Sequence, residues 1–82
     1  MKQIEWSEES LDDLAALDKG VARRVTASVE RFSETGIGNI KKLQGINPPE
    51  FRLRVGDYRV RLHIEGNTLR ILRVSNRKDA YR

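Results

Sequence analysis

The chain has 82 residues, no cysteine and one histidine, a composition that predicts one small domain and excludes disulfides and a Cys/His zinc site. Its formal net charge of +4 is unevenly divided, because residues 1–50 hold seven Lys/Arg and nine Asp/Glu, whereas residues 51–82 hold nine and three. The first part therefore carries a charge of −2 and the second a charge of +6. This asymmetry predicts that the N-terminal part builds a scaffold and the C-terminal part meets an anionic partner.

Targeting and membrane signals are missing from the sequence. The N-terminus lacks the apolar core of a signal peptide, and no stretch approaches the roughly 18 apolar residues that a membrane span requires. We therefore expect a cytoplasmic protein that has no membrane partner. We also expect that it uses no cofactor.

The first part of the chain predicts a strand and two helices. Residues 2–6 alternate weakly and form a strand candidate. Ser7 is a favourable N-cap, and leucines at a spacing of three predict a helix over about residues 8–18. A break at residues 18–20 separates it from a second amphipathic helix that ends near Gly36. Because the connection is short, we expect an antiparallel helical hairpin that covers one face of a sheet.

The most informative stretch is residues 51–61, FRLRVGDYRVR, in which apolar and basic residues alternate with a period of two. Gly56 and Asp57 form a two-residue turn of the Gly-X kind, which favours a type II′ hairpin. This turn predicts two facing pairs of arginines: Arg54 with Arg59, and Arg52 with Arg61.

The four arginines share one face of this hairpin, and the apolar side chains share the other. Like charges directly opposite each other destabilise a hairpin by roughly 0.2–1 kcal/mol per pair, so a purely structural hairpin would rarely carry them. The alternative is an ordinary solvated face, which usually mixes Lys, Glu and Thr. No acid or hydroxyl residue interrupts the basic face between positions 52 and 61, so we predict that it binds an anion.

The segments around the hairpin are less regular. Residues 36–49 predict a loop that contains Lys41 and Lys42, for which a solvated pair and a phosphate contact are equally good interpretations. A turn at residues 65–67 leads into a strand over residues 69–75. Its apolar residues fall on both parities, as in a central strand that is partly covered on both faces.

Together these elements give the order β-α-α-β-β-β and an α+β fold for a single domain over residues 1–82. We expect a curved, mainly antiparallel sheet with the two-helix hairpin packed on one face. The other face is left open, and it carries the arginines.

Several kinds of catalytic site are excluded by the residues present. The sequence has no Ser-His-Asp pattern and no glycine-rich phosphate loop, and the basic face is expected to supply no carboxylate to hold a metal. Arginines without carboxylates suit recognition of phosphate and stabilisation of charge on a phosphoryl group. Metal-free cleavage of RNA fits this pattern, because the substrate's own 2′-hydroxyl can attack the adjacent phosphate once the strand is positioned.

The hairpin FRLRVGDYRV, the terminal NRKDAYR and the order of elements resemble the RelE branch of the RelE/ParE toxin superfamily over essentially the whole chain. The resemblance implies a ribonuclease toxin of a type II toxin–antitoxin pair, which cuts messenger RNA in the ribosomal A site and so inhibits translation. It also implies a cognate acidic antitoxin, similar to RelB, that neutralises the toxin in a hetero-oligomer.

The resemblance also implies roles for individual residues. By position, Arg52 and Arg54 match the family's basic pair, Arg59 its phosphate-contacting arginine, Arg77 its C-terminal catalytic arginine, and Tyr81 a tyrosine thought to stack on or activate the substrate nucleotide. Well-known members have lysines at the first two of these positions, and arginine holds its proton too tightly to be a good general base. Stabilisation of the transition state is therefore the expected role of that pair. Further RNA contacts are predicted for Arg61, Lys41 and Lys42.

A second difference between this chain and the family concerns proton transfer. Many relatives have a histidine where this chain has Asn76, so Tyr81 becomes the first candidate for acid/base chemistry and His63 a distant second. The structural alternatives are a tail tyrosine folded onto the sheet and a half-exposed strand histidine. Tyr58 and Trp6 are interpreted as core aromatic residues.

Two other functions stay open. One is a toxin like ParE, which acts on DNA gyrase without cutting RNA, although that branch usually lacks the full set of basic residues and the terminal tyrosine. The other is a nucleic-acid-binding module without catalysis, which is supported by charge alone.

Overall fold

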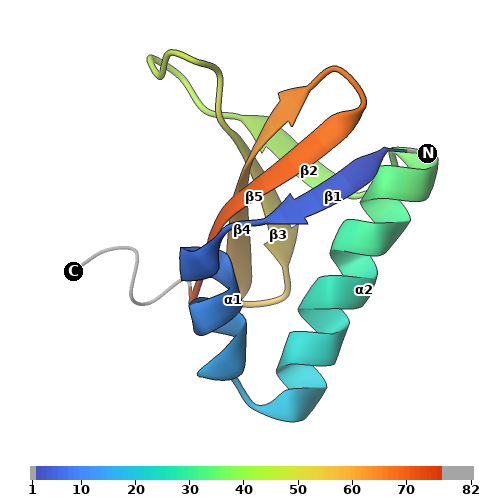
Figure 1. Ribbon diagram of the computed structural model, residues 1–82, viewed down its shortest axis with the longest axis vertical. Coiled ribbons are helices and arrows are strands. Elements are labelled where there is room, and N and C mark those ends of the chain that lie inside the picture. The colour runs from blue at the N-terminus through green and yellow to red at the C-terminus, as the bar shows by residue number, and fades with distance from the viewer. Residues whose placement is uncertain (1, 77–82) are drawn as a thin grey trace.

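The computed structural model describes residues 2–76, so the predicted site residues Arg77 and Tyr81 lie outside the described part. Within that part the chain forms one strand, two helices and four further strands (Figure 1). The bounds are β1 Gln3–Trp6, α1 Glu8–Ala15, α2 Lys19–Thr35, β2 Asn39–Lys42, β3 Phe51–Val55, β4 Tyr58–Glu65 and β5 Thr68–Asn76.

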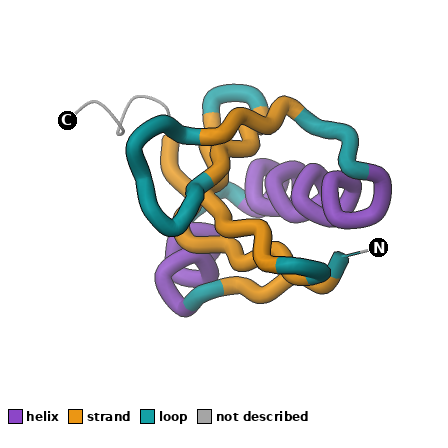
Figure 2. The backbone as a smooth tube through the Cα atoms, turned by 90° about the horizontal axis from the view of Figure 1, so that it is seen from above, coloured by secondary structure: helices purple, strands orange, loops and turns teal. Residues whose placement is uncertain are grey.

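The described strands form one sheet in the order β1-β5-β4-β3-β2. All neighbours pair antiparallel except β1, which runs parallel to β5. Helix α2 contacts β1 at one edge of the sheet and β3 next to the other edge, so the sheet curves around this helix (Figure 2). The predicted α+β fold with a curved, mainly antiparallel sheet is therefore confirmed.

The core lies between α2 and the face of the sheet that this helix covers. Helix α2 contributes Val25 and Val29, which recur at helical spacing and are at most 1% exposed. The sheet contributes five side chains that are at most 2% exposed: Leu53, Val60, Leu62, Leu69 and Ile71. Burial of each such side chain stabilises the fold by about 1.5–3 kcal/mol before conformational entropy is counted. Trp6 and Tyr58 pack against this core, as predicted.

Helix α1 is shorter than predicted. It ends at Ala15 instead of continuing to Asp18, because the Asp18 carboxylate caps α2 by accepting a hydrogen bond from the Gly20 N–H at 3.1 Å. An N-cap residue has a non-helical backbone, so the preceding helix has to finish before it. Two other predicted boundaries hold, since Ser7 caps the start of α1 and Gly36 caps the end of α2. The predicted break at residues 18–20 is too long, because α2 already begins at Lys19. No helix between residues 2 and 76 is long and apolar enough to cross a membrane.

The segment predicted as a loop over residues 36–49 contains a strand, so that prediction is wrong for residues 39–42. Strand β2 forms the edge of the sheet and pairs antiparallel with β3. Gly38 permits the close approach, because a Cβ atom there would lie 2.8 Å from Cδ1 of the buried Leu53. A four-residue strand with two lysines carries little signal of its own, and its pairing with β3 creates it.

Strand β5 contains a β-bulge. The pairing with β4 places Leu62 opposite Ile71 and Arg61 opposite Arg73. Leu72 is therefore an extra residue, which shifts the alternation of side chains by one position. Because of this shift, Ile71 and Val74 both face the core although they are three residues apart. The mixed parity seen in the sequence thus comes from the bulge and not from cover on both faces.

Candidate functional site

The predicted arginine hairpin forms between β3 and β4 with the predicted register. Arg54 lies opposite Arg59, and Arg52 lies opposite Arg61. Gly56 has a φ of 58°, and no described non-glycine residue has a positive φ, so the turn has the φ pattern of type II′. The side chains between the arginines, such as Leu53 and Val60, are buried on the helix side. The arginines consequently share the opposite, open face.

Pairing with the neighbouring strands extends these arginines into two rows that cross the sheet. The first row consists of Lys41, Arg52, Arg61 and Arg73, and the second consists of Asn39, Arg54, Arg59 and Ser75. Cβ atoms of directly opposite residues lie about 4.5–5.5 Å apart, so the first row brings four cations from four strands together. We refer to the two rows together as the basic face.

The two neighbouring lysines of β2 point to different sides of the sheet. Lys41 lies opposite Arg52 and belongs to the first row. Lys42 lies opposite Phe51, which packs against the core, so it is on the helix side. Both lysines are exposed. The structure therefore joins only Lys41 to the predicted arginines.

Two carboxylates reach the first row from outside the hairpin. Glu50 accepts hydrogen bonds from Arg61, with Nε to Oε2 and Nη2 to Oε1 both at 3.0 Å. Asp13 of α1 binds Arg73 in the same two-pronged way, at 2.9 and 3.1 Å. The expectation of a face without carboxylates is therefore wrong, because it rested on positions 52–61 alone. Glu50 and Arg52 are two residues apart, so their side chains lie on the same face of an extended chain, and this spacing was the sequence signal for a carboxylate on the basic face.

These ion pairs leave the first row charged mainly at one end. Arg61 and Arg73, on β4 and β5, each have a carboxylate partner, whereas Lys41 and Arg52 have none among the described residues. In the second row, Arg54 donates from Nε to the carbonyl of Gly56 at 3.2 Å, a contact that orients the guanidinium without neutralising it. The unbalanced positive charge of these residues therefore lies over β2 and β3.

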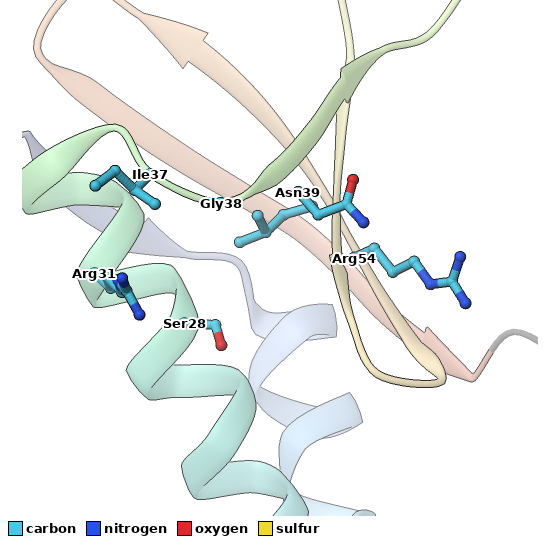
Figure 3. Close-up of a pocket in the computed structure, with 7 residues that line it drawn as sticks. Ser28, Arg31, Ile37, Gly38, Asn39 and Arg54 are labelled. Atoms are coloured by element: carbon cyan, nitrogen blue, oxygen red, sulfur yellow. The ribbon is translucent and has the colours of Figure 1, made fainter.

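Arg54 also borders a pocket between α2 and the edge of the sheet. The lining residues are Ser28, Arg31, Ile37, Gly38, Asn39, Leu53 and Arg54. Ser28 and Arg31 come from α2, and the Arg54 side chain extends away from this helix (Figure 3). The pocket thus lies beside the charged edge of the sheet and has a cation on each side.

His63 lies beyond the two rows, opposite Arg70. Its Nδ1 atom is 3.9 Å from a carboxylate oxygen of Glu65, and its side chain is 18% exposed. Arg70 is 3.5 Å from carboxylate oxygens of both Glu5 and Glu65, so this end of the sheet is balanced by acids. The surroundings are those of a structural strand histidine.

Asp13 also fixes α1 to the end of β5. Its Oδ2 atom accepts a hydrogen bond from the Val74 N–H at 2.9 Å, at the edge that β1 leaves uncovered. The hydrogen bonds from Arg73 hold the pKa of Asp13 below its usual value, and the Val74 N–H acts in the same direction against the opposing effect of burial.

The substitution Asp13→Asn should lower the free energy of unfolding by about 1–3 kcal/mol near neutral pH, since it removes charged hydrogen bonds. A carboxylate with a lowered folded pKa stabilises the protein above its unfolded pKa, and this contribution is lost as the pH falls through the folded pKa. The difference between wild type and variant should therefore shrink in acid. Urea unfolding at neutral pH and at acid pH measures this difference. Asp12→Asn, at an exposed position of α1, is the control. A difference that stays constant with pH would contradict this role.

The fold and the basic face define a class of protein, namely a small α+β protein that covers one side of a curved sheet with helices and exposes cations on the other. Family comparison then gives the identity: the chain belongs to the ParE toxin family of type II toxin–antitoxin systems, whose model matches residues 4–81. It is therefore a toxin of the RelE/ParE superfamily, as the sequence predicted.

Several solved structures have the same fold, among them RelE chains from two antitoxin–toxin complexes. A chain of the RelB–RelE antitoxin–toxin complex from Methanococcus jannaschii is 25% identical, with a TM-score of 0.77 and 94% of each chain covered. The RelE–RelB complex from Pyrococcus horikoshii OT3 gives 22% identity and a TM-score of 0.77, covering 93% of this chain and 94% of that one. YafQ from E. coli BL21(DE3) gives 13% identity and a TM-score of 0.76 with both chains fully covered. None of the curated proteins compared with the chain matches it.

Proposed function

We propose that this toxin is a metal-independent endoribonuclease that cleaves messenger RNA in the ribosomal A site and thereby inhibits translation. The observation that carries the proposal is the basic face, on which cross-strand pairing gathers cations from four strands into two rows. A single strand of RNA presents a chain of phosphates, and arginine matches phosphate geometry with two parallel hydrogen bonds. The face therefore offers several neighbouring positions for successive phosphates.

In this proposal Arg54 and Arg59, which face each other in the second row, hold the phosphate that is cleaved. The substrate's 2′-oxygen attacks the adjacent phosphorus, and the bond from phosphorus to the 5′-oxygen breaks. The products are a 2′,3′-cyclic phosphate and a 5′-hydroxyl, with one proton lost from the attacking oxygen and one gained by the leaving oxygen. The two guanidinium groups stabilise the charge that develops on the phosphate oxygens.

The other predicted residues complete the proposed site. Arg52 and Lys41 hold a neighbouring phosphate from the first row, where neither has an ion-pair partner among the described residues. Arg77 keeps the role that the resemblance implied, that of the C-terminal catalytic arginine, and Tyr81 keeps its predicted role in proton transfer. Neither role requires a metal, because arginine supplies the positive charge and the phenol supplies a proton.

We further propose that a cognate acidic antitoxin neutralises the chain in a hetero-oligomer. The matched chains from Methanococcus jannaschii and Pyrococcus horikoshii come from complexes with RelB, and another match comes from a YoeB–YefM complex of Staphylococcus aureus. The unbalanced cations over β2 and β3 suit an acidic segment, which would compete with RNA for the same charges.

A second candidate is inhibition of DNA gyrase without cleavage of RNA. It is favoured by one specific observation, namely that the matching family model is that of ParE toxins. The two candidates differ in the fate of cellular transcripts, which makes them separable by one experiment.

That experiment is primer extension across abundant transcripts after a brief pulse of expression, comparing wild type with Tyr81→Phe. We expect cuts in register with codons in the wild type and their loss in the variant, because phenylalanine has no proton to transfer. Intact transcripts accompanied by growth arrest and a DNA-damage response would instead support the gyrase candidate.

A further inference from the structure

Glu50 is the only charged residue among positions 2–76 that is buried, with 6% of its surface exposed. It directly precedes β3, and its carbonyl accepts a hydrogen bond from the Leu43 N–H at 2.8 Å, which ties it to the end of β2. Both of its carboxylate oxygens accept hydrogen bonds from Arg61. The partner side chain is 47% exposed, so the pair joins a buried acid to a base at the surface.

This pair has a large effect on the charge of the first row. A buried carboxylate is costly without a partner, so Glu50 holds Arg61 firmly. The Nε and Nη2 atoms of Arg61 are engaged, and the pair as a whole is neutral. A phosphate that approached Arg61 would have to compete with a carboxylate already in place. Arg52, directly opposite Arg61, meets no such competitor among the described residues.

We propose that Glu50 is a positioning residue that withdraws Arg61 from phosphate binding and so directs the RNA strand to the end of the first row that holds Lys41 and Arg52. The proposal rests on the proposed function, because it takes the basic face as the RNA site. The sequence predicted that Arg61 contacts RNA like the other arginines of the hairpin. In this proposal Arg61 is excluded from those contacts. Asp13 has the corresponding effect on Arg73 at the far end of the row.

Salt dependence of binding tests this proposal, since each phosphate contact on a single strand contributes about 0.7 to the slope of log K against log salt. The probe is a fluorescent oligodeoxyuridylate, which lacks the 2′-hydroxyl and so is not cleaved by the proposed reaction. Glu50→Gln should steepen the slope by about 0.7, because the freed Arg61 gains a phosphate. The double variant Glu50→Gln with Arg61→Gln should return to the wild-type slope. As a control, Glu34→Gln removes the same charge from an exposed position of α2 and should change nothing.

The double variant keeps the test decisive even if Glu50→Gln alone fails to fold, because it replaces the buried charged pair with two neutral amides. If Arg61 already binds phosphate in the wild type, the double variant will have a slope shallower by about 0.7, and the proposal is overturned. An unchanged slope in a folded Glu50→Gln variant also overturns it. Failure of the proposed function has a different result. If the basic face does not bind RNA, the Arg52→Gln variant will have the same slope as the wild type.

Discussion

Replacing Arg54 and Arg59 together with glutamine should lower the rate of RNA cleavage by about 10²–10⁴-fold and abolish growth arrest. The two side chains face each other across β3 and β4 and are the proposed holders of the cleaved phosphate. A hydrogen bond to a charged group contributes about 1.5–3 kcal/mol, and two such losses at a transition state combine to the stated range. The measurement is the cleavage rate of a defined transcript in a translation reaction with purified ribosomes.

A matched control comes from α2, where Lys19 and Arg23 are exposed. Replacing both with glutamine removes the same total charge without touching the basic face. This control variant should retain cleavage close to that of the wild type, whereas a comparable loss in the two double variants would show that net charge alone matters. Full toxicity of the variant with both Arg54 and Arg59 replaced would show that the second row is not part of the site.

The largest effect on stability is expected for Ile71→Ala. Ile71 is completely buried, and removal of such a side chain costs about 2–5 kcal/mol through lost burial and the cavity that remains. This is a large share of the roughly 5–15 kcal/mol that a small domain has in total. Urea unfolding would measure the difference in the free energy of unfolding between variant and wild type.

The neighbouring residue provides the comparison. Leu72 is also aliphatic, but the structure places it at the bulge of β5, partly exposed. Leu72→Ala should therefore cost less than about 1.5 kcal/mol, because it vacates less buried volume. Equal losses for the two variants would mean that the strand is covered on both faces and that the bulge is misplaced. The bulge also matters for the site, since it sets Arg73 opposite Arg61.

The sequence alone determined the arginine face of the hairpin. A period of two puts apolar and basic residues on opposite faces, and the turn at Gly56 fixes which residues of the two strands face each other. The start of α1 at Ser7 and the end of α2 at Gly36 were predictable for the same reason, since capping depends on residues within one turn of the helix. All of these features result from interactions between residues close together in the chain.

Other features were decided only by the tertiary structure. Strand β2 exists because it pairs with β3, and the bulge at Leu72 exists because Ile71 and Val74 both have to reach the core. The partners of Arg61 and Arg73 are separated from them by 11 and 60 residues. The parity of Glu50 indicates the face on which it lies, but neither its pairing with Arg61 nor that of Asp13 with Arg73 follows from a local pattern. Charge on this face depends on which carboxylates the folded chain brings to it, and that is a property of long-range packing.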